Sequence, residues 1–242
     1  MRAAIDGDIV LYAVCFAANN DPVSYACRSA RSFCEKVMHS LNVEGADIYL
    51  TGKGNYRVAY GDADHPYKGN RSSDKPYHFE ELRKYMIENL GAVLVEGEEA
   101  DDVMGILGAD LSHVICTLDK DLDGVPGLHY NWKRKELYWV TPEDADRFFY
   151  TQLLTGDSTD NIPGLFKRVG MKATKKIVEP IWEMEEPADM YDYVRDVYME
   201  GYMKVGICPD DADTVIDDWL LRQGRMLWIR REEGEVWNAP QS

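Results

Sequence analysis

Acidic residues gather at three places in the sequence, each directly after a short apolar run. Asp6 and Asp8 follow the first run, while further groups follow residues 92–95 and 113–117. These later groups contain Glu98, Glu99, Asp101 and Asp102, and Asp119, Asp121 and Asp123. Clusters made of Asp and Glu suit hard cations that prefer oxygen ligands, which means Mg²⁺ or Mn²⁺. Two such ions can activate water, steady the attacking oxygen and stabilise the leaving one.

A basic, glycine-punctuated segment follows a further acidic pair, Asp157 and Asp160. Residues 161–178 carry five basic side chains and no acid, although the chain as a whole is acidic. The basic residues are Lys167, Arg168, Lys172, Lys175 and Lys176. Glycines let the backbone approach a phosphate or a monovalent cation closely, and a helix N-terminus attracts anions. An anion-binding motif and an ordinary basic helix are the two interpretations, and we favour the first.

A shorter motif, Tyr67-Lys68-Gly69-Asn70-Arg71, lies in a polar segment (residues 52–77) with little periodicity. Its two cations are three residues apart and have an aromatic ring beside them. Such a group could grip a phosphate and stack a base. On its own the motif is also compatible with a surface loop.

The elements that would position these residues alternate between strands and helices. Strands are predicted at residues 2–6, 46–51, 92–95 and 113–117, with a hairpin at 128–130 and 136–140. Helices are predicted near residues 8–18, 25–41 and 79–90, from 99 onward, and from Thr141 to Gly156, with Asp8 as the first cap. The alternation predicts an α/β fold, a central mostly parallel twisted sheet flanked by helices. The three acidic groups should then meet beyond the carboxyl ends of the strands.

Length and composition restrict the class of protein. The 242 residues include 45% hydrophobic residues, enough for a core, and no run long enough to span a membrane. Five cysteines without a Cys-x-x-Cys pair indicate reduced thiols in a cytoplasmic protein. The net charge of −16 argues against nucleic-acid binding as an average, but it is unevenly distributed. Residues 179–218 hold thirteen acids against Arg195 and Lys204, so the basic segment stands beside a strongly acidic one.

Taken together, the motifs resemble the flap endonuclease or 5′-nuclease family, in particular the free-standing 5′→3′ exonucleases of tailed bacteriophages. Asp6-Gly7 resembles the end of the family's first metal-binding strand. Glu99-Ala100-Asp101-Asp102 and Thr117-Leu118-Asp119-Lys120-Asp121 resemble its two acidic signatures. Residues 67–71 are similar to its arch, and residues 156–176 to its acidic pair followed by a helix–three-turn–helix motif.

The resemblance implies a PIN-like 5′-nuclease core with a helical arch. Domains would cover residues 1–155 with the arch at about 53–90, the helix–three-turn–helix motif at 156–180, and an acidic region at 181–242 packed on the core. The tail around residues 223–230 lies outside the general resemblance, and we expect a helix and a strand packed on the core there. The metal ligands would be Asp6, Glu99, Asp101, Asp102, Asp119, Asp121, Asp157 and Asp160. Lys68 and Arg71 would stabilise the scissile phosphate. DNA would be bound by Tyr67, Lys68, Arg71, Lys167, Arg168, Lys172, Lys175 and Lys176.

The same resemblance implies a divalent-metal-dependent 5′→3′ exonuclease or flap endonuclease that uses two Mg²⁺ or Mn²⁺ ions. Its products would carry a 5′-phosphate and a 3′-hydroxyl. Its partners would be DNA with 5′ ends, flaps or overhangs and RNA–DNA hybrids, with a K⁺ ion in the three-turn motif. We expect a monomer in the cytoplasm, of a host cell if the protein is of phage origin.

One departure from the family pattern concerns the second core strand, which the family usually follows with an Asp. Here Thr51 and Gly52 occupy that region, and no carboxylate stands between Leu50 and Gly54. We expect Asp8 to cap a helix rather than bind metal directly. The Thr51 hydroxyl or an ordered water would then take the vacant position.

Two other functions fit parts of the sequence. Asp6-Gly7-Asp8-Ile9-Val10 also matches the motif of haloacid-dehalogenase-like phosphatases, in which Asp6 would be the nucleophile. That chemistry does not require the basic segment or the acids at 99–102. The second alternative is a module that binds branched DNA but has lost catalysis. The missing carboxylate after the second core strand would account for that loss.

Overall fold

The computed structural model describes residues 1–71, 74–165, 174–206 and 209–240. Within these ranges the chain forms two compact units. Unit 1 comprises Met1–Asn55, Ser73–Val140 and Ile229–Gly234, and unit 2 comprises Tyr56–Ser72, Thr141–Trp228 and Glu235–Ser242. Each unit has its own hydrophobic core, so each is considered separately below.

Unit 1 is built on a six-stranded sheet in the order β3-β2-β1-β4-β5-β6. Neighbouring strands are parallel from β3 to β5, and β6 pairs antiparallel to β5. The strands are β1 (Arg2–Asp6), β2 (Ala46–Thr51), β3 (Val93–Val95), β4 (His113–Cys116), β5 (Gly127–Asn131) and β6 (Glu136–Val140). The strand order reverses direction between β1 and β4, and open α/β sheets bind ligands beyond the carboxyl ends at such a point.

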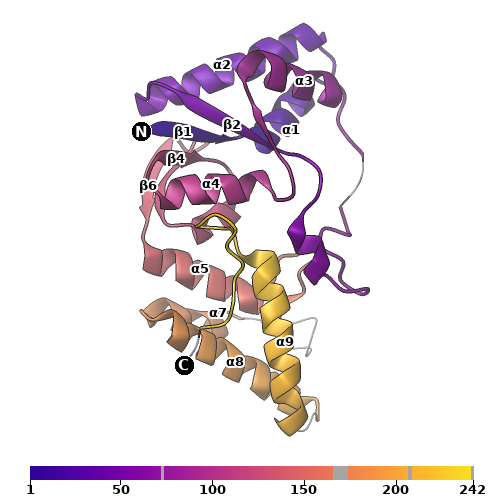
Figure 1. Cartoon of the computed structure of the whole chain (residues 1–242), viewed down its shortest axis with the longest axis vertical. Helices are drawn as coiled ribbons and strands as arrows, with labels where there is room; N and C mark the ends of the chain where they lie inside the picture. Colours follow the sequence, from indigo (N-terminus) through magenta and orange to yellow (C-terminus); the bar gives the residue numbers. More distant parts are fainter. Residues whose placement is uncertain (72–73, 166–173, 207–208, 241–242) are drawn as a thin grey trace. The chain divides into compact units, whose positions relative to one another are not determined.

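Helices cover both faces of this sheet, as Figure 1 shows. Successive residues of β1 point to opposite faces, so Ala3 and Ile5 enter one core cluster while Ala4 enters another. The first face packs against α1 (Gly7–Ala17), α2 (Val23–Leu41) and α3 (Phe79–Leu90). The second packs against α4 (Ala100–Ala109), and Ile229 from the C-terminal segment completes that cluster.

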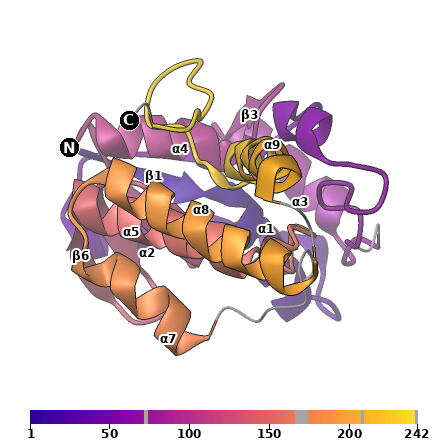
Figure 2. The same cartoon turned by 90° about the horizontal axis from the view of Figure 1, so that it is seen from below.

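Unit 2 is helical. Its helices are α5 (Pro142–Thr155), α7 (Lys175–Val178), α8 (Pro187–Lys204) and α9 (Pro209–Leu227), with 3₁₀ turns η1 (Tyr56–Tyr60) and η3 (Glu179–Glu183). Figure 2 shows α8 running along α5, with α9 beside them, and the three pack against one another. Their shared core is rich in aromatic rings, and Phe149 contacts both Trp228 and Trp237.

The sequence-based boundaries of β1, β2, β6 and α3 are confirmed, and Thr141 caps α5 as expected by accepting a hydrogen bond from Asp144 N. The predicted hairpin is confirmed as the antiparallel pair β5 and β6. The strand expected in the C-terminal tail is wrong, because residues 228–230 form no strand. Instead, Ile229 packs in the core beside α4, and Arg230 N donates to the side chain of Asp102 in α4. Among the described helices, none combines the length and the apolar character that crossing a membrane would require.

Candidate functional site

The carboxyl ends of β1 and β4 are joined by a side-chain hydrogen bond in unit 1. Thr117, which follows β4, donates its hydroxyl to Asp6 Oδ2 at 2.7 Å. Asp6 Oδ1 accepts from Ile9 N at 3.0 Å and so caps helix α1. Both oxygens of this buried carboxylate are therefore fixed at the point where the strand order reverses.

Asp6 is buried beside other carboxylates. Desolvation, together with the smaller effect of the charges of Asp8 and Asp119, raises the pKa of Asp6 to about 7, although its two hydrogen bonds oppose the shift. A buried carboxylate flanked by acids is costly unless a cation or a proton offsets its charge. This part of the sheet edge therefore favours a bound cation.

Asp8 does not cap α1, which corrects the sequence-based expectation, because Asp6 already holds that position. Asp8 Oδ2 instead accepts from Thr51 N, at the end of β2, at 3.0 Å. The Thr51 hydroxyl also donates to Asp8 and accepts from Ala100 N at 3.0 Å. The hydroxyl at the position without a carboxylate therefore links Asp8 to the first turn of α4. Arg83 donates to Thr51 O at 2.8 Å and adds a cation near Asp8.

In the acidic group at the start of α4, one carboxylate accepts hydrogen bonds from backbone N–H groups. Asp102 is fully buried, and its two carboxylate oxygens accept from Glu99 N at 3.1 Å and Arg230 N at 3.2 Å. Glu98 forms an ion pair with Arg230, which holds the C-terminal segment against this helix start. Glu99 is buried at the N-cap of α4, while Asp101 is partly exposed in its first turn.

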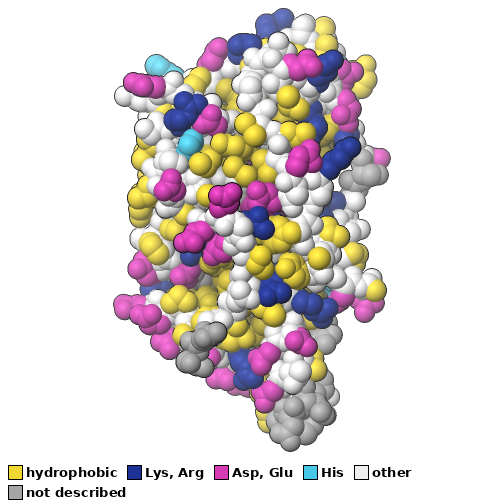
Figure 3. Space-filling model, viewed as in Figure 1, with side chains coloured by type: hydrophobic (Ala, Val, Ile, Leu, Met, Phe, Trp, Pro, Cys, Tyr) yellow, Lys and Arg dark blue, Asp and Glu magenta, His cyan; other side chains and the backbone are white. Residues whose placement is uncertain are grey.

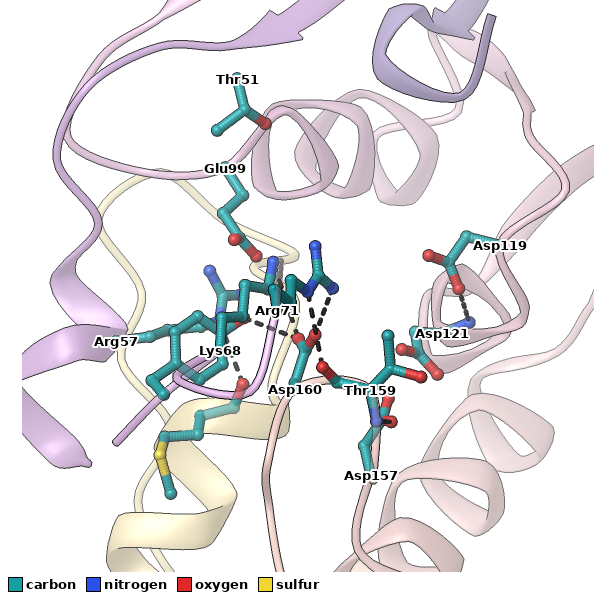
Figure 4. A network of polar contacts seen from close by, with 12 residues as sticks. Thr51, Arg57, Lys68, Arg71, Glu99, Asp119, Asp121, Asp157, Thr159 and Asp160 are labelled. Atoms are coloured by element: carbon teal, nitrogen blue, oxygen red, sulfur yellow. Dashed lines mark hydrogen bonds and ion pairs between the residues drawn. The ribbon is translucent and has the colours of Figure 1, made fainter. Parts of the chain in front are cut away.

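The acids after β4 lie at a 3₁₀ turn, η2 (Lys120–Gly124): Asp119 caps the turn, and Asp121 and Asp123 lie within it. Asp119 Oδ1 accepts from Asp121 N at 3.0 Å, and Asp119 N donates to the Thr117 hydroxyl at 2.9 Å. Thr117 therefore connects Asp6 to this turn. Asp119 and Asp121 are both partly exposed and keep carboxylate oxygens near the edge of the sheet (Figure 4).

The donor set fits a hard cation, although it does not form a ready cage. In the part of the chain that the structure describes, no three His, Cys, Asp or Glu side chains converge closely enough to hold an ion. Mg²⁺ commonly uses one or two carboxylates and keeps several waters, so such an open arrangement suits it. The burial of Asp6 beside the charges of Asp8 and Asp119 also favours a bound cation. The full set of eight ligands stays a prediction.

Asp157 and Asp160 belong to a tight turn in unit 2. Residues Asp157 and Ile162 exchange backbone hydrogen bonds at 2.9 and 2.7 Å, and Asp157 Oδ1 accepts from Thr159 N at 2.7 Å. Gly156 adopts a φ of +67°, and a side chain there would meet Ile162 O at 2.3 Å, so the turn requires glycine. Asp157 is buried, and its side chain and backbone hydrogen bonds stabilise the turn that contains it.

Three side chains of the predicted motif at residues 67–71 converge on Asp160, as Figure 4 shows for Lys68 and Arg71. Arg71 forms an ion pair with Asp160 Oδ1, and Lys68 Nζ lies 3.6 Å from Oδ2. The Tyr67 hydroxyl donates to Oδ2 at 2.9 Å. The structure therefore brings Asp160, which was predicted to bind metal, together with the three side chains of the motif that were predicted to bind DNA.

The ring of Tyr67 is 8% exposed and packs in the core of unit 2. A base cannot stack on this ring unless it leaves the core, so the geometry does not favour the stacking role expected for Tyr67. Lys175 and Lys176 are exposed at the start of α7, and Lys175 lies 3.2 Å from Glu179. Lys167, Arg168 and Lys172 lie outside the described residues. On the face drawn in Figure 3, basic and acidic side chains are interspersed.

Sequence reasoning missed Thr117, which positions the acids at the sheet edge, and Arg57, which is buried in unit 2. The Thr117 hydroxyl had a usable signal, because it stands between an apolar run and Asp119. Arg57 had none: it is 2% exposed and donates to Met226 O at 3.1 Å and Trp228 O at 2.6 Å, far along the chain. A buried arginine that satisfies backbone carbonyls in a distant segment leaves no local pattern in the sequence.

Comparisons with known proteins give one partial sequence match and several structural ones. No protein-family model matches the chain. An alignment of 119 positions, which covers 43% of this chain, shows 31% identity to the thermostable DNA polymerase I of Thermus aquaticus. The match spans only 14% of that polymerase.

Solved structures from phage T5 are similar along most of the chain. A T5 protein co-crystallised with metal ions has a TM-score of 0.52 at 15% identity, covering 91% of this chain and 98% of that one. T5 5′-exonuclease with bound divalent metal ions (zinc) gives 0.51 at 16% identity, covering 93% and 100%. A point mutant of T5 5′-exonuclease gives 0.51 at 15% identity, covering 90% and 98%. The chain therefore shares the fold of these phage T5 structures, which confirms the predicted mostly parallel α/β class with flanking helices.

Proposed function

We propose that this protein is a divalent-metal-dependent 5′-nuclease that hydrolyses DNA phosphodiester bonds at or near 5′ ends. The observation that carries the proposal is the sheet-edge cluster around Asp6, where a buried carboxylate with both oxygens fixed by hydrogen bonds lies beside the charges of Asp8 and Asp119. The shared fold with T5 5′-exonuclease and the partial match to a DNA polymerase support the same substrate class.

In this proposal, the carboxylates at the ends of β1 and β4 and at the start of α4 hold Mg²⁺ or Mn²⁺. Asp6 and Asp119 are fixed by the Thr117 hydroxyl, while Glu99 and Asp101 are placed by the first turn of α4. Bound metal would supply an activated water and stabilise the leaving oxygen. Two ions, with Asp157 and Asp160 among their ligands, follow from the family resemblance, as do products with a 5′-phosphate and a 3′-hydroxyl.

Unit 2 supplies the phosphate contacts in this proposal. Lys68 and Arg71 would meet the negative charge that develops on the scissile phosphate, and Lys175 and Lys176 would add affinity for the DNA backbone. Lys167, Arg168, Lys172 and a K⁺ ion belong to the same proposed motif. RNA–DNA hybrids are a second substrate to be tested beside DNA.

The phosphatase alternative leaves other features without a role. Its chemistry does not require the acids at the start of α4 or the basic residues after Asp160, whereas the proposed nuclease uses both. A non-catalytic DNA-binding module would have no need for a desolvated carboxylate in an acidic cluster, because that arrangement repels phosphate.

The proposal is tested by incubating the protein with a duplex that carries a 5′ single-stranded overhang, in Mg²⁺ and in EDTA. We expect shortened products only with Mg²⁺, and an equivalent 3′-overhang duplex should be a poorer substrate. Full activity in EDTA would contradict metal dependence. Binding without cleavage in both Mg²⁺ and Mn²⁺ would favour the non-catalytic module.

A further inference from the structure

Three hydrogen-bond donors of different chemistry surround one carboxylate in unit 2. The Tyr67 hydroxyl, the Lys68 ammonium and the Arg71 guanidinium all meet the oxygens of Asp160. We call these three side chains the anion cradle. Two cations and a hydroxyl around a single small anion are also what a phosphate group requires, and Arg binds phosphate and carboxylate with the same geometry.

The backbone around the cradle is held independently of the Asp160 carboxylate. Lys68 N donates to Asp160 O at 2.9 Å, Asn70 Nδ2 to Ser158 O at 2.7 Å, and Asn161 Nδ2 to Pro66 O at 3.0 Å. The buried Tyr67 ring anchors the same loop in the core. The loop should therefore keep its place when the carboxylate is neutralised or swings away.

The pairs within the cradle are partly open to solvent. The exposed fractions of the side chains are 23% for Lys68, 48% for Arg71 and 14% for Asp160. Ion pairs with such exposure contribute little net stability, because water and salt screen them. A phosphate, with more charge and more acceptor oxygens than a carboxylate, competes well for donors held in this way.

We propose that Asp160 acts as an internal counter-anion, which occupies the cradle in the free protein and is displaced from it by a phosphate of the nucleic acid. This inference rests on the proposed function for its ligand class. Asp160 lowers the affinity for DNA in the absence of metal, and its departure leaves Lys68, Arg71 and the Tyr67 hydroxyl to hold the phosphate.

The test compares Asp160→Asn with the wild type in EDTA, so that cleavage does not interfere. Asparagine keeps an oxygen that can accept from the Tyr67 hydroxyl but removes the competing charge. Binding is measured by fluorescence anisotropy with a labelled 5′-overhang duplex. We expect Asp160→Asn to bind about tenfold more tightly, which corresponds to ~1.4 kcal/mol. The charge-matched control is Asp64→Asn, an exposed position of the same segment, which should stay within about twofold of wild type because surface charges are screened.

A double variant locates the effect. Arg71→Gln combined with Asp160→Asn should lose most of the gain, because the proposed competition takes place at the Arg71 guanidinium. Equal gains in Asp160→Asn and Asp64→Asn, or weaker binding by Asp160→Asn, would overturn the inference. A gain that persists in the double variant would also overturn it.

A measurement without DNA separates this inference from the proposed function. An amine-specific reagent followed by mass spectrometry reports how accessible Lys68 is, and its labelling rate should rise in Asp160→Asn but not in Asp64→Asn. If the wild type fails to bind the duplex while Lys68 labelling rises as expected, the proposed function fails and the counter-anion contact stands. An unchanged labelling rate would show that Asp160 does not occupy the cradle in solution.

Discussion

Asp8 and Thr51 are joined across the sheet edge of unit 1 by a hydrogen bond of 3.0 Å from Thr51 N to Asp8 Oδ2. The Thr51 hydroxyl reinforces this contact. It also accepts a hydrogen bond from the backbone N–H of Ala100, the first residue of α4. A neutral hydroxyl thus stands where the family resemblance led us to look for an acid. It connects the acid after β1 to the helix that carries Glu99 and Asp101.

Thr51→Val should separate Asp8 from the start of α4. Valine keeps the shape of threonine but leaves Ala100 N without its acceptor, which should cost about 1–3 kcal/mol of unfolding free energy. Turnover should fall as well, because Glu99 and Asp101 lose their alignment with Asp8. Thr51→Ser retains the hydroxyl and is the matched control. Denaturant unfolding and turnover rates check both effects, and equal values for the two variants would refute the linking role.

Asp101→Asn and Asp102→Asn should behave differently although the residues are adjacent. Both oxygens of Asp102 accept backbone hydrogen bonds, so its amide variant leaves one N–H unpaired and should lower stability by roughly 1–3 kcal/mol. Asp101 is partly exposed, and its amide variant should lower turnover by orders of magnitude with little change in stability. Melting curves and turnover measured on both proteins decide the matter. The reverse pattern would move the metal-binding role to Asp102.

His129 should make unit 1 less stable in mild acid. It is 1% exposed, its Nε2 contacts Val125 O at 2.9 Å, and desolvation lowers its pKa below the ordinary 6.5. The unfolded chain therefore takes up a proton near pH 6.5 while the folded chain does not. Stability should decrease as the pH falls below about 7 and continue to do so down to the folded pKa.

His129→Gln removes this titration while keeping a side-chain donor for Val125 O. The unfolding free energy of the variant should therefore change less between pH 7 and pH 5 than that of the wild type. Urea unfolding at several pH values gives the two slopes. Parallel slopes would mean that His129 is not the group responsible.

Lys175 and Lys176 should contribute DNA affinity rather than turnover. Each true phosphate contact that is neutralised should lower the log–log salt slope of duplex binding by about 0.9. Lys175 is 89% exposed and lies 3.2 Å from Glu179, so Glu179→Gln should strengthen binding where Lys175→Gln weakens it. Salt titrations of DNA binding test the pair, and slopes that stay at the wild-type value would leave α7 as an ordinary basic helix.

The sheet was predictable because its strands are short apolar runs that end in acids or turn residues. The meeting of their acids at one edge follows from parallel pairing, which the alternation of strands and helices implies. The different hydrogen-bonding roles of the individual acids were harder to predict from the sequence. Asp6 and Asp8 are two residues apart, and only their hydrogen bonds in the fold show that Asp6 caps the helix while Asp8 binds Thr51 N at the end of β2.

Contacts between distant segments explain the remaining differences. The pairing of Asp160 with Lys68 and Arg71 spans about ninety residues, and the bond from Arg230 N to Asp102 spans 128. Neither has a local pattern, because each depends on where a tertiary fold brings a loop or a tail. The Arg57 contacts to the end of α9 belong to the same class.

The most direct test of the account is Mg²⁺-dependent cleavage of a 5′-overhang duplex by Asp6→Asn and by the wild type. Asparagine is also a good N-cap and can still accept from Ile9 N, so the variant should fold. We predict wild-type cleavage that saturates with Mg²⁺, and no detectable cleavage by Asp6→Asn, which should still bind the same DNA in EDTA. Cleavage by Asp6→Asn at a rate near that of the wild type would contradict a metal centre at the end of β1.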